Sequence, residues 1–129
     1  MNEIFYSIAE DGNIVGSIEN DTAYDEKCYR LGNYFKTKEE AEFVRKKQLV
    51  LQELKDYAFE HNEEPVDWDN CYQLKHCLKY DWDKKKVYCG WDTNVQDMNQ
   101  VYFASEKIAK NAIKDIGEDR IKKYLFEID

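Results

Sequence analysis

Two triplets of an acid, a tryptophan and a second acid have a spacing that suggests a chemical role. They are Asp67-Trp68-Asp69 and Asp81-Trp82-Asp83, and Asp92 follows a third tryptophan. Two carboxylates two positions apart in a loop can hold a divalent cation, but neither triplet has the glycine and the later glutamate of a calcium loop. Two readings stay open. The tryptophan anchors the loop in the core between solvated acids, or it is an exposed binding anchor ringed by negative charge.

A second candidate group is formed by Cys71, His76, Cys77 and Cys89, which are close in sequence. Zinc needs four converging ligands, and neighbours in a strand point to opposite faces, so His76 and Cys77 cannot both reach one ion. No serine has a nucleophile-elbow context and no glycine-rich phosphate loop occurs. We therefore expect reduced thiols, no metal, no cofactor and no enzymatic activity.

Charge and composition narrow the class of partner. The 129 residues carry a formal net charge of −8, with 43% hydrophobic and 15% aromatic residues. Such an aromatic chain is not typical of disorder, and the acid excess argues against a protein that coats nucleic acid. An acidic surface suits a basic partner. The predicted partner-binding residues are Asp21, Asp25, Glu26, Asp67, Trp68, Asp69, Asp81, Trp82, Asp83 and Asp92.

The alternative is binding of nucleic acid by a lysine-rich hairpin in the second half of the chain. Its residues are Lys75, Lys79, Lys84, Lys85 and Lys86, with tyrosines at 72, 80 and 88 available to stack on bases. Lysines neutralise phosphates and aromatic rings support unpaired bases, so this combination is typical of single-strand binding.

A repeated phrase shows how these residues are positioned. Tyr34-Phe35 is followed by Thr37 and an alanine at 41, and Tyr102-Phe103 is followed by Ser105 and an alanine at 109. In each copy a strand runs into a helix that a hydroxyl residue caps, and Glu40 completes a capping box for the first. The chain is therefore predicted to be two units of one plan, 1–63 and 64–129, packed together as one compact domain.

The first unit is predicted to have strands at 3–9 and 14–19 joined by a tight turn at 11–13, a polar loop at 20–31, a short third strand at 34–35 and a helix from about 38 to 60. The second opens with an alternating strand at 72–80. Its core face is predicted to carry residues 72, 74, 76, 78 and 80, and its other face Lys75, Cys77 and Lys79. Strands at 86–91 and 101–103 and helices at 106–116 and 118–126 follow. The fold class is α+β: two antiparallel β-meanders, each followed by a helix, with helices packed on one sheet face.

Most of the chain resembles small proteins encoded by bacteriophages and prophages of Gram-positive bacteria. The resemblance lies in the phrase at 32–42, the acid-tryptophan segment at 66–69, the hairpin at 80–81 and the second strand-to-helix phrase at 102–109. It implies a genomic origin and no function. Residues 35–41 are also similar to the helix entry of the arm-type DNA-binding module of phage integrases. That module reads DNA from its sheet with basic residues, whereas this chain has no lysine or arginine before Lys27.

These observations favour a small acidic protein-binding module. We expect a phage-encoded inhibitor that occupies the basic, nucleic-acid-binding surface of a host nuclease or defence complex. The first residues lack the basic start and apolar run of a signal peptide, and no apolar stretch approaches the roughly 18 residues of a membrane span. The expected location is the cytoplasm of the bacterial host.

Overall fold

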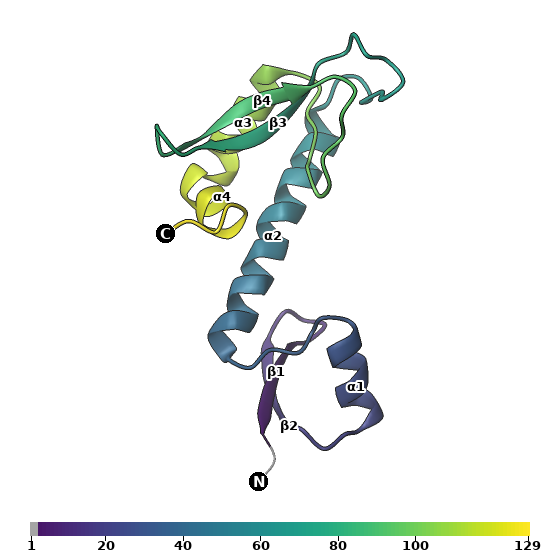
Figure 1. Cartoon of the computed structure of the whole chain (residues 1–129), viewed down its shortest axis with the longest axis vertical. Helices are drawn as coiled ribbons and strands as arrows, with labels where there is room; N and C mark the ends of the chain where they lie inside the picture. The colour runs from purple at the N-terminus through teal and green to yellow at the C-terminus, as the bar shows by residue number, and fades with distance from the viewer. Residues whose placement is uncertain (1–2) are drawn as a thin grey trace. The chain divides into compact units, whose positions relative to one another are not determined.

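The computed structural model describes residues 3–129 and confirms an α+β fold with two separate antiparallel sheets (Figure 1). The chain divides into two compact units, Met1–Gln48 and Leu49–Asp129. The sequence prediction placed the division after residue 63, at the end of a helix, whereas these units divide inside that helix. The elements are β1 (Ile4–Ile8), β2 (Ile14–Ile18), α1 (Ala23–Arg30), α2 (Lys38–His61), β3 (Lys75–Asp81), β4 (Lys86–Asp92), α3 (Glu106–Ile116) and α4 (Glu118–Tyr124).

The first unit is built on the β1–β2 hairpin, which pairs Ile4 with Ile18 and Ile8 with Ile14. The turn uses Gly12 at a φ of 86°, a left-handed conformation that glycine adopts without a Cβ clash. The predicted third strand is a single bridge: Tyr6 and Phe35 exchange two backbone hydrogen bonds of 2.8 Å each. A strand needs a ladder of several residue pairs, so this single pair does not count as a third strand. The segment lies beside β1 without adding a strand to the sheet.

The polar loop predicted at 20–31 is wrong, because α1 occupies most of it. Thr22 caps this helix by accepting a hydrogen bond from the backbone N–H of Asp25 at 3.1 Å. In return, the Asp25 carboxylate accepts the backbone N–H of Thr22 at 3.3 Å. Aspartate thus takes the place of the usual glutamate or glutamine in a capping box. With only eight residues, α1 has too little apolar periodicity to be seen in the sequence.

Both predicted hydroxyl caps are confirmed. Thr37 Oγ1 accepts the backbone N–H of Glu40 at 3.1 Å, one residue before α2 begins. Ser105 Oγ accepts the backbone N–H of Ile108 at 3.2 Å at the start of α3. Gly117 ends α3 at a φ of 111°, and α4 starts at the next residue. Local sequence signals therefore define these helix boundaries well.

The second unit repeats the hairpin-and-bridge plan with longer strands. β3 and β4 pair from Lys75 with Asp92 to Asp81 with Lys86. His76 bridges Phe103 as Tyr6 bridges Phe35. Leu78 and Val87 lie on the sheet face that joins the core, and α3 and α4 pack against β4 (Figure 1). The core is completed by Val50, Leu54, Ala58, Phe103, Ala109, Ala112, Ile116 and Ile121.

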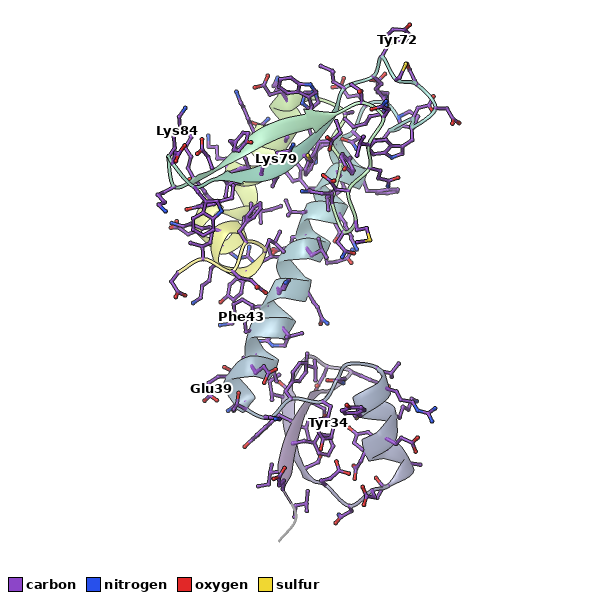
Figure 2. The ribbon with its side chains drawn as sticks, viewed as in Figure 1. Tyr34, Glu39, Phe43, Tyr72, Lys79 and Lys84 are labelled. Carbon is purple, nitrogen blue, oxygen red and sulfur yellow. The ribbon has the colours of Figure 1, made fainter. Side chains whose placement is uncertain are left out.

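The predicted assignment of β3 faces is partly wrong. Tyr72, expected in the core, is 91% exposed in the loop before the strand, and Leu74 is 45% exposed (Figure 2). Lys75 and Cys77, expected at the surface, are fully buried. Alternation in sequence indicates that a strand has two faces but not which other segments cover them.

Candidate functional site

The acidic pocket of the first unit is lined by Glu19, Asp21, Asp25, Glu26, Tyr29 and Tyr34, and its volume is about 430 Å³. It therefore brings together three acids that the sequence singled out. No lysine or arginine is among the lining residues. Glu19 and the two tyrosines were missed by sequence reasoning. Their signal was weak, because they belong to three different segments that only the fold joins.

Three local features position the pocket. Glu19 follows the last residue of β2, and its backbone N–H donates to the carbonyl of Glu3 at 2.8 Å. Asp21 turns the chain with a φ of 53°, a left-handed conformation that aspartate tolerates better than most residues. Thr22 then starts α1, whose first turns carry the other acids and Tyr29.

Tyr34 is held in the acidic pocket by contacts on several sides. Its hydroxyl donates to Glu19 Oε2 at 2.7 Å, and its ring stacks on Phe5 with centroids 4.4 Å apart. Tyr29 meets the same ring edge-on at 5.5 Å. The hydrogen bond to Glu19, desolvation and nearby carboxylates raise the pKa of Tyr34 to about 12. The phenol therefore stays protonated and holds Glu19 in place.

The four carboxylates of the pocket differ in their hydrogen-bond and ion-pair partners. Asp25 is buried, and its carboxylate accepts the backbone N–H groups of Asn20 at 2.9 Å and Thr22 at 3.3 Å. These bonds to its charged form lower the pKa of Asp25. Glu26 pairs with Arg30 one helical turn away at 2.6 Å, with both side chains largely exposed. Asp21 is exposed. Asp25 thus shapes the pocket, Glu26 shares its charge with Arg30, and Asp21 faces solvent.

The two acid-tryptophan triplets take both of the roles left open by the sequence. Trp68 is half-buried, edge-on to Tyr102 at 4.8 Å and under the Lys75 ammonium at 5.2 Å. Trp82 is 62% exposed beside the β3–β4 turn, with Lys85 over its ring at 4.8 Å. The first tryptophan therefore anchors a loop, and the second is a surface ring partly covered by a cation.

The acids of the triplets mostly order turns. Asp67 Oδ1 accepts the backbone N–H of Asp69 at 3.0 Å. Asp81 Oδ1 accepts the N–H groups of Asp83 at 2.9 Å and Lys84 at 3.1 Å. Such bonds from an aspartate to the backbone two or three residues on are typical of turns. Asp92 is half-buried and accepts the hydroxyl of Tyr102 at 3.3 Å. The triplets and the acidic pocket lie in different units.

Lys75 cannot be part of an exposed basic patch, and this prediction is corrected. Its ammonium donates to the backbone carbonyls of Asn70 at 2.5 Å and Thr93 at 2.6 Å and is fully buried. It joins the loop before β3 to the loop after β4, which is why that sheet face is covered. Lys79 is half-buried and lies across Gly90 (Figure 2). The exposed lysines of the hairpin are Lys84, Lys85 and Lys86.

A second concave surface lies in the other unit, between β4 and α3. We call it the edge groove; its volume is about 560 Å³. Lys86 and Tyr88 border it from the strand, and Lys110 and Lys114 from the helix. The sequence reasoning missed the two helical lysines. Their spacing of four residues places them on one helix face, but only the fold brings that face beside β4.

The cysteines and histidines form no metal cluster in the part of the chain that the structure describes. Cys89 Sγ lies 3.6 Å from His76 Nδ1. Burial raises the pKa of the Cys89 thiol and lowers the pKa of His76, so both groups favour their neutral forms. This is the opposite of the thiolate and imidazolium that an activated cysteine needs.

No protein-family model matches the chain, and no curated protein or solved structure is significantly similar to it. Across residues 3–129, none of the helices has the length and apolar character that crossing a membrane requires.

Proposed function

We propose that this protein is an acidic binding module whose acidic pocket receives an arginine or lysine side chain from a basic partner protein. The observation that carries the proposal is the pocket's composition: carboxylates of Glu19, Asp21 and Glu26 surround two tyrosine rings, with no basic residue in its lining. Carboxylates pair with a guanidinium through charge-assisted hydrogen bonds, and tyrosine faces attract cations. The two kinds of group suit one ligand.

The exposed ring of Tyr29 gives the pocket an aromatic wall. Tyr29 is 72% exposed and leans against Tyr34, which Glu19 and Phe5 hold in place. Exposed tyrosines contribute contact area at a low cost in side-chain entropy and are enriched where proteins bind one another. A flat guanidinium stacked on this wall would reach the carboxylates at the floor. Arginine is therefore the preferred occupant over lysine.

A basic partner surface of this kind is typical of proteins that bind nucleic acid. An acidic module that covers such a surface competes with the phosphate backbone and inhibits the partner. The phage-like sequence pattern adds the biological setting: a phage-encoded protein acting in the host cytoplasm on a nuclease or defence complex. The net charge of −8 supports this by favouring fast, salt-sensitive association with a basic protein.

The test replaces three carboxylates of the pocket with amides of nearly the same shape. The variant Glu19→Gln, Asp21→Asn, Glu26→Gln removes three charges at the pocket. The matched control Glu60→Gln, Glu63→Gln, Glu64→Gln removes three exposed charges elsewhere. The first probe is a synthetic arginine-rich peptide, with binding measured at low and high salt. We expect the pocket variant to bind at least about tenfold more weakly and the control to bind almost as the parent does.

The second step is capture of partners from host lysate with the tagged parent protein, the pocket variant and the control. Nuclease treatment separates protein partners from those carried by nucleic acid. A partner that survives nuclease, leaves at high salt and is missing only from the pocket variant supports the proposal. Equal binding of the arginine-rich peptide by the pocket variant and the control would contradict the proposal, because bulk charge alone would then explain the interaction.

A further inference from the structure

The edge of β4 that points away from β3 pairs with no other strand among the described residues. His76 exchanges both backbone hydrogen bonds with Phe103, at 3.0 and 2.7 Å, so the backbone groups of His76 point away from β4. Backbone groups alternate between the two sides along an antiparallel pair. The register pairs His76 with Trp91, so Trp91, Cys89 and Val87 direct their N–H and C=O groups outward from the sheet.

The opposite edge of the hairpin is covered, whereas most of this one is not. On β3, Phe103 bridges His76, and Gln100 Nε2 donates to the carbonyl of Leu78 at 3.1 Å. On β4, Glu118 Oε1 accepts the N–H of Val87 at 3.0 Å. Among the hydrogen bonds of residues 3–129, none involves the outward N–H groups of Cys89 and Trp91. An uncovered strand edge of this kind is a template for another strand.

The edge groove runs beside these outward groups. Its strand side carries Lys86, which is exposed, and Tyr88, which is 40% exposed. Its helix side carries Lys110 and Lys114, with the half-buried Ile113 between them. Lys110 is paired with Glu106 at 2.9 Å, and the carboxylate of Glu118 is engaged by Val87. With Lys110 and Glu118 already engaged, Lys86 and Lys114 give the groove a positive border beside the unpaired strand groups. The protein as a whole carries a net charge of −8.

We propose that the edge groove binds an extended acidic segment of a partner protein, which adds to β4 as a new strand. The outward groups of β4 alternate donors with acceptors, and a peptide backbone offers the same alternation. A DNA backbone offers acceptors alone and would leave the β4 carbonyls unmatched. The lysines select acidic side chains. A second copy of β4 would bring its own groove lysines against those of the first copy, so like-charge repulsion disfavours pairing of two copies.

The two sides of the groove also define the side chains of the segment. Successive residues of an added strand point alternately to the two faces of the sheet. On one face they meet Tyr88 and Lys86, and on the other Ile113 between two lysines. A segment that alternates an acid with a β-branched apolar residue places its acids beside the helical lysines and its apolar residues beside Tyr88. The site is separate from the acidic pocket, so the two proposals stand or fall independently.

The test uses the full chain and a short synthetic peptide that alternates glutamate with valine. Binding is followed by the backbone amide resonances of the isotope-labelled protein. We expect the amides of residues 87–91 to shift on titration and the exchange of the Cys89 and Trp91 amide protons with solvent to slow by about tenfold or more, because both become hydrogen-bonded. A peptide of the same pattern with lysine in place of glutamate should leave these resonances unchanged.

Charge variants separate the groove from general electrostatics. Lys86→Glu with Lys114→Glu reverses two groove lysines, and we expect it to weaken peptide binding by about tenfold. The matched control, Lys84→Glu with Lys107→Glu, reverses two exposed lysines outside the groove lining and changes the net charge equally. The control should bind the peptide with nearly the parental affinity. The carboxylate variant of the acidic pocket should also bind it normally.

Three results would overturn the proposal. The first is the absence of shifts at residues 87–91 at the highest soluble peptide concentration. The second is an effect of a thymidine oligonucleotide on these amides that disappears in the groove variant, while the peptide has no effect. That result would assign the groove to single-stranded nucleic acid. The third is perturbation of the same amides by raising the protein concentration alone, with a doubled mass by light scattering, which would assign the edge to self-association.

Discussion

Glu118 accepts the backbone N–H of Val87 at 3.0 Å, so the first residue of α4 caps the first outward-facing donor of β4. The contact joins a helix start to a strand edge and closes one end of the edge groove. A carboxylate is favoured at this position twice over, because it also lies at the positive end of the α4 dipole. The hairpin and the last helix are therefore held together at this point by polar contacts as well as by the core.

Removing this cap should loosen the end of β4. We expect Glu118→Ala to lower the free energy of unfolding by about 1 kcal/mol, the cost of a lost hydrogen bond to a charged group in a partly buried setting. Glu118→Gln keeps an acceptor oxygen and should lose less. Amide hydrogen exchange checks the mechanism: Val87 should exchange faster in the alanine variant while core amides such as Leu54 follow only the global change. Unchanged exchange at Val87 would contradict it.

Lys75 should be among the residues least tolerant of substitution in the hairpin. Lys75→Met keeps the approximate length of the side chain but leaves the carbonyls of Asn70 and Thr93 without the buried ammonium that donates to them. We expect a loss of about 2–4 kcal/mol in the free energy of unfolding, measured by urea denaturation. The control is Lys84→Met at the exposed turn, which should change it by less than about 0.5 kcal/mol. Similar losses in both variants would show that the contacts of Lys75 contribute little.

The capping box of α1 should be visible as a dependence of stability on pH. Hydrogen bonds from the backbone of Asn20 and Thr22 lower the pKa of Asp25 below its usual value of 3.8. A carboxyl with a lowered native pKa stabilises the fold above its unfolded pKa, and the stabilisation is lost as the pH falls through the native pKa. We expect acid unfolding of the first unit to lose this component in Asp25→Asn. Circular dichroism melts between neutral pH and about pH 3 measure it.

The second hydrogen bond of the α1 capping box, accepted by the Thr22 hydroxyl, can be removed without changing a charge. Thr22→Ala deletes the hydroxyl that accepts the N–H of Asp25, and we expect a loss of about 1 kcal/mol at neutral pH. Thr22→Ser keeps the acceptor and should restore most of the stability. Equal stability of the alanine and serine variants would mean that the cap contributes nothing measurable.

Tyr34 should titrate well above the ordinary tyrosine pKa of about 10. Its hydrogen bond to Glu19 raises the pKa of Tyr34 to about 12. A raised native pKa stabilises the fold below the unfolded pKa, and this contribution is lost as the pH rises through the native value, here between about 10 and 12. The ring-carbon resonance of Tyr34 reports the titration directly. Glu19→Gln should move the midpoint toward the ordinary tyrosine value, and an unchanged midpoint would exclude Glu19 as the cause.

Elements with local signals were predicted well from the sequence. The capped start of α3 at Ser105 and its end at Gly117 depend on contacts within a few residues, and both are confirmed. The hairpin turn around Gly12 is also local. The α1 helix depends on local contacts too, but its capping box uses Asp25 where a glutamate is usual and its apolar face is short. It was therefore read as a loop, since acids and tyrosines are equally common in loops.

The sequence by itself determined the fold class, the repeated plan of a β-meander followed by a helix, and the clustering of acids near the end of the first hairpin. Periodicity, caps and turns act over a few residues, so they can be read locally. Only the tertiary structure decided which of these residues share a surface. It buried Lys75 against two carbonyls, set Tyr34 on Glu19 to form the acidic pocket, and brought Lys110 and Lys114 beside the open edge of β4. Burial and convergence depend on contacts between segments distant in sequence, and single-residue patterns carry no record of those contacts.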